Sequence, residues 1–500
     1  MSVGPGEVEV PVVREPQIGR TEATQAEIPQ ERPHASQPWA GWYSWRDNMI
    51  KGLYIPALHK PLPDPGNVFS DVLGYGKTNL LQTLWFLLGA LGFIATAAGG
   101  SGAAGCSGAV LLFIPHNSVL TFLFGLAYER AIKYHKMFGS LLLIPLVMHA
   151  LHEGWGEWGG REITGTAALG AYGALVLLSQ NPIRRRFWEL FKIPHLILAA
   201  VFVVAAIAHG DVVGSLFVPL VLYAADLLLR GRRRFERTKV VRAEQLEGSD
   251  ITVLEVECPR AASYEAGQYG FIMIPKLSPI EWHPYSSSGY PGASTLTFAM
   301  KPMGKSVWSS KALGALQEGD TVRIDGPYGY PEVPFHLYSK VVLVAGGIGC
   351  TPMISIARDV IQTVRRGEAY HKVKQLHFNW TVRNPHDLLL AQEEISFMRS
   401  FARSDLITFK VDLYVSKAAA GGQELGVEFH EKRMDVSAML KSYADPDGTR
   451  GCLCTPHNND SAVAVMVCGP AVLADQVERL CNEYSTKSVP MHSHVETFLF

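Results

Sequence analysis

The sequence predicts a multi-domain membrane protein in which an apolar helical region precedes an antiparallel barrel and an α/β domain. Three observations lead to this fold class. Long apolar runs gather between residues 79 and 230. Short alternating strands such as ITVLEVEC and YGFIMIP begin at about residue 238. From residue 340 an apolar strand leads through a glycine-rich turn into a helix, which is typical of nucleotide-binding α/β domains.

Composition and charge exclude several other classes. Charged residues make up 18% of the 500-residue chain, below the roughly 25% of an average soluble protein. The net charge is −1 and no basic stripe is present, so we expect no nucleic-acid partner. The seven cysteines have no spacing typical of secreted proteins and are expected to be reduced thiols. The N-terminal MSVGPGEVEV lacks the layout of a signal peptide, so internal helices are expected to enter the membrane.

Two segments precede the apolar region, which we place at residues 79–231. Residues 1–40 are rich in Pro, Glu and Gln without any period, and this composition predicts a disordered cytosolic tail. Residues 41–78 mix aromatic residues with Lys and Pro, which is typical of a membrane-interface segment or of a plain linker.

Six membrane spans are predicted in the apolar region, with an error of one. They are expected at about 79–98, 106–127, 132–152, 165–180, 193–209 and 213–229. Several lie near the lower limit of about 17–25 residues for crossing a bilayer. Pro115-His116-Asn117 interrupts the second, which leaves open one kinked span or a short span followed by an interfacial helix; His116 is expected to be structural. Basic residues gather in alternate loops, so both termini are expected in the cytosol.

Four histidines have matched spacing in the third and fifth spans. His135 and His149 are 14 residues apart, as are His195 and His209, so each pair shares a helix face with about 21 Å between its members. Both spans run outward from the cytosol, which places His135 level with His195 and His149 level with His209. Ionisable groups in lipid are costly and usually functional, so we predict axial ligation of two b-type haems. The alternatives are packing histidines, or His152 in place of His149.

The barrel region carries a motif suited to a flavin. In HPYSSS, Tyr285 can pack on an isoalloxazine ring, and Ser286 or Ser287 can hydrogen-bond flavin N5 or the ribityl-phosphate arm. The downstream string LTFAMKPMGKSVWS offers a pyrophosphate cradle, although Lys301 could instead be a solvated charge. The candidate flavin-binding residues are His283, Pro284, Tyr285, Ser286, Ser287, Lys301, Gly304 and Ser306.

The string VVLVAGGIGCTPMISI predicts a nucleotide site. Gly346, Gly347 and Gly349 let the backbone approach a phosphate, and Thr351-Pro352 opens a helix whose amides favour the anion. The string is not GxGxxG, and a structural glycine turn is the alternative.

Two further strand ends complete the predicted nucleotide cleft. In FNWTVRN, Arg383 can meet a 2′-phosphate, which favours NADPH over NADH. In VMVCGP, Cys468 and Gly469 are expected beside the nicotinamide, although a buried cysteine is often only packing. The tight turn GPYGYP at 326–331 is expected to line the same cleft.

Together these motifs resemble the ferric reductase and NADPH oxidase superfamily. The resemblance covers residues 105–500 through the four histidines, IKYHKMFG, HPYSSS, GPYGYP, GGIGCTP, CGP and VETFLF. It implies a six-helix haem core followed by a ferredoxin-reductase-like module, with an FAD-binding barrel at 237–335, an NADPH-binding domain at 339–500, and a terminal aromatic, Phe500, over the flavin. The stretch PHNSVLTFLFGLAYERAIKYHKMFG resembles plant and fungal ferric-chelate reductases. The insertion at 442–462 departs from the usual pattern.

The resemblance implies a transmembrane oxidoreductase. Electrons from cytosolic NADPH would pass through FAD and two haems to a ferric, or cupric, chelate on the opposite face, with Cys468 and Phe500 at the hydride-transfer site. The main alternative is an NADPH oxidase that makes superoxide from dioxygen. The plasma membrane is the expected location, with an internal membrane as the alternative. An iron permease or a second copy of the chain as partner stays open.

Overall fold

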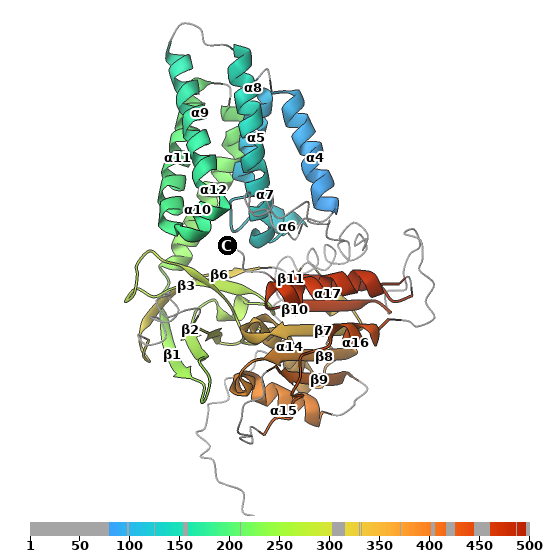
Figure 1. Ribbon diagram of the computed structural model, residues 1–500. Helices are drawn as coiled ribbons and strands as arrows, with labels where there is room; N and C mark the ends of the chain where they lie inside the picture. The colour runs from blue at the N-terminus through green and yellow to red at the C-terminus, as the bar shows by residue number, and fades with distance from the viewer. Residues whose placement is uncertain are drawn as a thin grey trace, which may run out of the picture.

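A helical bundle, a barrel and an α/β domain follow one another along the chain, and the bundle stands on the two soluble domains (Figure 1). The computed structural model describes residues 80–97, 100–124, 126–153, 159–210, 212–302, 316–329, 331, 333–370, 372–401, 406–416, 426–444, 461–486 and 488–496. The predictions that lie outside these residues concern the tail 1–40, the segment 41–78, most of the insertion 442–462, and Gly304, Ser306 and Phe500.

The bundle contains helices at or near the predicted positions, although the second position holds two short ones. In the described part of the chain these are α4 (Leu80–Ala95), α5 (Ser101–Leu112), the consecutive α7 (Tyr128–Leu141) and α8 (Leu143–Glu153), α9 (Gly160–Leu178), α11 (Trp188–His209) and α12 (Val213–Arg234). Among the described residues, three segments are long and apolar enough to cross a membrane: Tyr128–Glu153, Leu190–His209 and Val213–Arg234. The predicted membrane region is therefore present, and the count of six spans stays a prediction.

The predicted interruption separates two helices. Helix α5 ends at Leu112 and the short α6 (Val119–Phe124) begins after the Pro-His-Asn turn, so the structure has a short helix followed by a second one. Proline has no N–H and biases the preceding residue away from helical backbone. Asp226 of α12 accepts the backbone N–H groups of His116 at 3.2 Å and Asn117 at 2.8 Å, which satisfies donors that a continuous helix would have used.

The surface of the bundle is apolar. Leu88, Leu196, Val204 and Leu228 have exposed fractions of 64%, 59%, 67% and 76%. Side chains of this kind on several neighbouring helices form a large apolar surface, which a water-soluble protein rarely exposes. The outward-facing residues are therefore suited to lipid. The short α10 (Asn181–Arg186) carries basic residues between α9 and α11.

The barrel domain is antiparallel, as predicted. Its strands are β1 (Thr238–Gln245), β2 (Thr252–Glu257), β3 (Tyr269–Met273), β4 (His283–Ser286), β5 (Thr295–Met300) and β6 (Thr321–Tyr328), in the order β4-β3-β6-β1-β2-β5. A bridge between Ser287 and Phe298 joins the two edge strands and closes the sheet. Closure removes free edges and encloses a core that includes Leu254, Ile272 and Ile324.

The α/β domain has a parallel sheet with helices on both faces. Its strands are β7 (Lys340–Gly346), β8 (Gln375–Val382), β9 (Thr408–Val415), β10 (Val463–Cys468) and β11 (Met491–Glu496), and its helices are α14 (Cys350–Arg365), α15 (Gln392–Ser400), α16 (Val436–Lys441) and α17 (Ala471–Tyr484). The strand order is β11-β10-β7-β8-β9. The chain starts at the central β7, adds strands on one side, and then returns to the other side. Such a switch point, here between β7 and β10, is where open α/β sheets bind ligands.

Candidate functional site

The four predicted histidines meet in the predicted pairs. The ring centres of His135, on α7, and His195, on α11, are 6.3 Å apart. Those of His149, on α8, and His209, at the end of α11, are 5.9 Å apart. The first pair lies toward the soluble domains, and we call it the inner pair; the second is the outer pair. His152 is exposed, so His149 is the residue that faces His209.

The spacing of each pair suits a metal held between two imidazoles. A ring nitrogen binds a transition metal at about 2 Å and lies about 1 Å from the ring centre, so two axial imidazoles on one metal have centres about 6 Å apart. Both pairs match this separation. The residues present therefore fit an iron at each level.

Two rings are oriented by backbone carbonyls. Nδ1 of His135 lies 3.0 Å from the Val110 carbonyl oxygen, and Nδ1 of His209 lies 2.8 Å from that of Arg161. A carbonyl only accepts, so the proton is on Nδ1 in both rings and Nε2 is left for coordination. The guanidinium of Arg161 also donates to the His209 carbonyl at 3.2 Å, which joins the start of α9 to the end of α11.

Side chains accompany the other two rings. Ser179 donates its hydroxyl proton to the Leu175 carbonyl at 2.7 Å, so its oxygen accepts from Nδ1 of His195 at 3.0 Å. Glu153 places a carboxylate oxygen 4.0 Å from Nδ1 of His149. The hydroxyl at His195 is the kind of hydrogen-bonded partner that metal-binding histidines almost always have, whereas the contact at His149 is longer than a hydrogen bond.

A cavity lies beside the outer pair. Its volume is about 440 Å³, and both His149 and His209 line it; ligand pockets measure about 300–1,000 Å³. A Cβ at Gly165 would lie 2.8 Å from Cε1 of His209, and one at Gly100 would lie 3.1 Å from Cε1 of His149. The absence of a side chain at these two glycines therefore leaves space for the two imidazole rings. Neither glycine was predicted from the sequence, because each meets its histidine from another helix or turn.

The HPYSSS motif lies on β4 and the turn after it, as predicted. Ser286 is buried, and its hydroxyl has no hydrogen-bond partner among the described residues. Buried hydroxyls nearly always have a hydrogen-bond partner, so a ligand atom here would supply the partner that Ser286 lacks. Burial raises the pKa of Tyr285 to about 12, so its hydroxyl stays protonated. His283 and Pro284 are half-buried at the start of the strand, and the Ser287 N–H donates to the Gln268 carbonyl at 2.9 Å.

Lys301 links the two soluble domains. Its ammonium lies 2.9 Å from carboxylate oxygens of both Asp250 and Asp387. Asp387 is buried in the α/β domain and also accepts the Ser249 hydroxyl at 2.7 Å. Lys301 is thus paired with two carboxylates and is not a freely solvated charge. A role toward pyrophosphate stays a prediction.

The glycine-rich turn lies at the switch point of the sheet, but its glycines have different roles. A Cβ at Gly349 would lie 2.6 Å from the Cys468 carbonyl oxygen, and one at Gly469 would lie 2.9 Å from Cα of Gly346. These three glycines let the ends of β7 and β10 touch. Only Gly347 of the turn, with φ +56° and nothing within 4 Å of where a Cβ would lie, faces open space. Gly346 and Gly349 thus bring the two strand ends together, and a role of all three glycines of the GGIG turn toward a phosphate stays a prediction.

The remaining predicted nucleotide residues surround this turn. Thr351 and Pro352 are buried in the first turn of α14, so the helix N-terminus follows the glycines as predicted. Arg383 is exposed directly after β8, the strand beside β7. Cys468 is buried at the end of β10, where burial and Glu496 raise the pKa of its thiol. The thiol is therefore neutral.

A bundle with paired imidazoles, joined to an antiparallel barrel and a parallel α/β domain, is the architecture of a membrane-bound flavoprotein reductase. Family models agree for three consecutive segments. They are a ferric reductase like transmembrane component at 100–206, an FAD-binding domain at 236–332 and a ferric reductase NAD binding domain at 338–482. The chain therefore has the domains of the ferric reductase and NADPH oxidase superfamily, and the predicted resemblance is confirmed.

Relatives come from both branches of the superfamily. Ferric reduction oxidase 7, chloroplastic, of Arabidopsis thaliana is 28% identical over 62% of this chain and 46% of its own length. Ferric reduction oxidase 2 of Arabidopsis thaliana is 30% identical over 51% of this chain and 38% of its own. NADPH oxidase 1 of Mus musculus is 26% identical over 56% of this chain and 49% of its own. The chain thus spans less than half the length of these relatives.

Proposed function

We propose that this chain is a transmembrane oxidoreductase that moves electrons from cytosolic NADPH through FAD and two b-type haems to a ferric chelate on the opposite face. The observation that carries the proposal is the facing of His135 with His195 and of His149 with His209, at separations that suit a metal. When bound, the nicotinamide supplies hydride, the flavin divides it into single electrons, and the haem irons carry these across the membrane.

In the α/β domain, the residues bind and orient the nucleotide. The open backbone at Gly347 and the N-terminal amides of α14 suit a phosphate. The exposed guanidinium of Arg383, at the end of the neighbouring strand, suits a 2′-phosphate and so selects NADPH. Cys468, proposed beside the nicotinamide, has a buried and neutral thiol, so it would place no charge against the ring.

In the barrel, the residues hold the flavin in a dry site. The unpaired hydroxyl of Ser286 can complete its hydrogen bonding with a flavin atom. Tyr285 stays protonated, so its ring can pack on the isoalloxazine without placing a negative charge beside it. Phe500, proposed as the aromatic that covers the flavin, lies outside the described residues.

In the bundle, oxygens hydrogen-bonded to Nδ1 would hold three of the four rings in the tautomer that offers Nε2 to iron. The Val110 and Arg161 carbonyls and the Ser179 hydroxyl do this for three of the four rings. Apolar residues, among them Phe138, Leu142 and Phe202, pack in the core of the bundle around them.

The acceptor is proposed as a ferric chelate, with dioxygen as the second candidate. The outer cavity is lined by Glu153, Glu162 and Arg161 as well as by the outer pair, so charged side chains of both signs lie beside the space where an acceptor would meet the outer pair. The oxidase alternative is supported by the similarity to NADPH oxidase 1. Cytosolic termini are proposed from the basic residues in the last turn of α12, on the side of the soluble domains. The plasma membrane is proposed as the membrane that the bundle crosses.

The test is anaerobic addition of NADPH to the purified chain in lipid nanodiscs, with flavin and haem absorbance recorded. We expect flavin bleaching followed by reduction of both haems, and slower reduction with NADH. Ferric citrate added next should reoxidise the haems rapidly. Rapid reoxidation by dioxygen with stoichiometric superoxide, and none by ferric citrate, would establish the oxidase instead; a chain that binds no haem would exclude both.

A further inference from the structure

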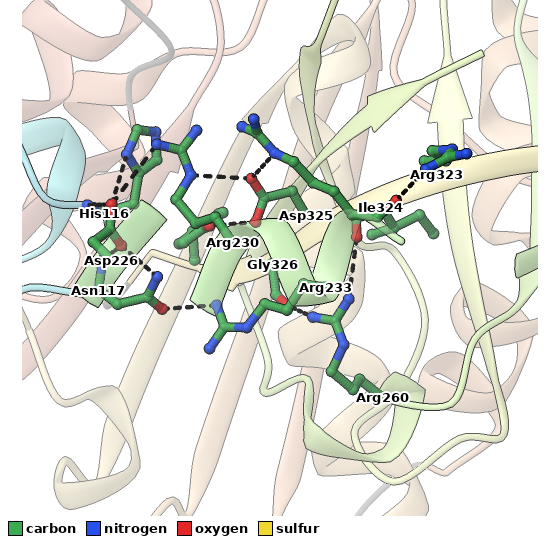
Figure 2. A network of polar contacts seen from close by, with 12 residues as sticks. His116, Asn117, Asp226, Arg230, Arg233, Arg260, Arg323, Ile324, Asp325 and Gly326 are labelled. Carbon is green, nitrogen blue, oxygen red and sulfur yellow. Dashed lines mark hydrogen bonds and ion pairs between the residues drawn. The ribbon is translucent and has the colours of Figure 1, made fainter. Parts of the chain in front are cut away.

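A dense polar network joins the bundle to the barrel (Figure 2). It lies where the last turns of α12 run onto strand β6 of the barrel. In the sequence, the basic residues at the end of α12 serve only to indicate the cytosolic side. The structure shows that several of them make specific contacts. We call this set the junction network: His116, Asn117, Asp226, Arg230, Arg233, Arg234, Arg260, Asp325 and Tyr328.

Asp325, on β6, is the centre of the junction network. Its side chain has an exposed fraction of 0%. It accepts from Nε of Arg230 at 3.2 Å and from Nε of Arg234 at 2.8 Å, both on α12. It also accepts the hydroxyl of Tyr328, on its own strand, at 2.5 Å. One buried carboxylate of the barrel thus holds two guanidiniums of the membrane domain.

A second buried carboxylate extends the junction network into the bundle. Asp226 lies one turn before Arg230 on α12, with 3.7 Å between carboxylate and guanidinium. It accepts the side-chain amide of Asn117 at 2.6 Å, in addition to the backbone of the α5–α6 turn. The Asn117 carbonyl in turn accepts from Arg233 at 2.7 Å. The α5–α6 turn, helix α12 and the barrel are therefore joined by one continuous set of hydrogen bonds and ion pairs.

Aromatic rings connect the junction network to the inner pair. The ring of Tyr328, which Asp325 holds, is 5.3 Å from that of His116. His116 stacks on Tyr128 with ring centres 3.7 Å apart and planes at 16°. Tyr128 begins α7, and His135 follows on the same helix about two turns later. The orientation of the barrel is thereby tied to the helix that carries one inner imidazole.

We propose that Asp325 is a positioning residue that fixes the flavin-binding barrel against the membrane bundle and so sets the approach of the flavin to the inner pair. This inference rests on the proposed function. Two guanidiniums meet a carboxylate that is itself closed to water, and removing the charge of a buried ion-pair partner is strongly destabilising for the contact. An amide in its place keeps the volume and loses the charge that holds both guanidiniums.

The experiment compares Asp325→Asn with Asp320→Asn. Asp320 lies just before the same strand and pairs with the exposed Lys276 at 2.5 Å, away from the bundle. In stopped flow with NADPH, Asp325→Asn should bleach its flavin at the wild-type rate but reduce its haems more slowly by about tenfold or more, because small misplacements of reacting groups cost orders of magnitude. Ferricyanide, which takes electrons directly from flavin, should be reduced at the wild-type rate. Asp320→Asn should match the wild type throughout.

A second variant and a second readout protect the test against misfolding. Arg234→Gln changes the more exposed partner, at 29%, and should slow haem reduction in the same way. Asp325→Glu, which keeps the charge, should restore much of the rate. Amide hydrogen exchange should rise in residues 113–118 and 321–328 of Asp325→Asn and not in those of Asp320→Asn.

Three results would overturn the inference. They are wild-type haem reduction in Asp325→Asn, equal slowing in Asp320→Asn, or slowed flavin bleaching together with slowed haem reduction. If the wild-type chain itself does not pass electrons from NADPH to haem, the proposed function fails, while the exchange comparison still decides whether Asp325 fixes the junction.

Discussion

The inner and outer imidazole pairs share one ligand chemistry and differ in their surroundings. The inner pair is packed among aromatic residues, with the ring of Phe191 5.0 Å from that of His195, and its Nδ1 atoms meet a carbonyl and a hydroxyl. The outer pair lies beside a cavity whose walls include glycines, and one of its rings is next to the carboxylate of Glu153, which is 62% exposed.

The two surroundings suit the two imidazole pairs to different tasks. A closed, apolar surrounding suits a site that receives electrons from a partner inside the same protein. A cavity with an exposed carboxylate at its edge suits a site that exchanges electrons with an acceptor from outside. Charge, hydrogen bonding and exposure around a haem set its potential, so the two levels are expected to differ in potential as well as in access.

The largest effect is expected when a histidine ligand is removed and one of the two haems is lost. In His195→Ala, the inner haem should be missing and NADPH should no longer reduce the remaining one, because its donor is gone. In His209→Ala, the outer haem should be missing while the inner one is still reduced. Haem-to-protein ratios and anaerobic NADPH spectra measure both. His152→Ala, on the exposed face of α8, is the control, and the reverse pattern of reducibility would overturn the inner and outer order.

Filling the outer cavity should remove only the outer haem. In Gly165→Val, the new side chain begins at a position 2.8 Å from the His209 ring, so the ring and a porphyrin cannot both fit. Gly170→Val on the same helix, where a Cβ meets nothing within 4 Å, is the matched control for helix propensity. Haem content should fall by one per chain in the first variant only. Two haems in Gly165→Val would show that the cavity is not the outer site.

Removing the hydroxyl beside the inner pair should have a smaller effect. In Ser179→Ala, Nδ1 of His195 loses its acceptor, and loss of such a partner weakens metal binding by about 10–100-fold. Haem titration of the apoprotein should show one weakened site and a changed low-temperature spectrum for the inner level. Ser215→Ala, whose hydroxyl donates to the carbonyl of Val212 just before α12 at 2.9 Å, is expected to leave both sites unchanged.

The smallest expected effect concerns Glu153. In Glu153→Gln, a negative charge near Nδ1 of His149 is lost, which should raise the midpoint potential of the outer haem. Because the carboxylate is exposed and screened, we expect a rise of no more than about 60 mV, the equivalent of one tenfold change for one electron. A redox titration measures it, with the inner haem as internal reference, and an equal rise in both haems would contradict the assignment.

Regular periodicity made much of this protein predictable. Because a helix repeats every 3.6 residues, two histidines 14 residues apart must share a face, and the alternation of basic loops places His135 level with His195. Strand alternation in the barrel and the apolar strand before the glycine turn followed equally from local pattern. For these features, the residue pattern within a single segment is enough to predict the helix or strand and the side that faces the core.

Contacts between distant parts of the chain were decided only by the tertiary structure. Gly165 makes room for a ring on another helix, Lys301 pairs with a carboxylate 86 positions away, and Asp325 binds guanidiniums of α12 from more than 90 positions away. The sequence determined which residues face a common side within an element. Which residue of another element contacts them depends on how the three domains pack. The contact partner of a buried charge or of a glycine cannot be predicted from the periodicity of the neighbouring sequence.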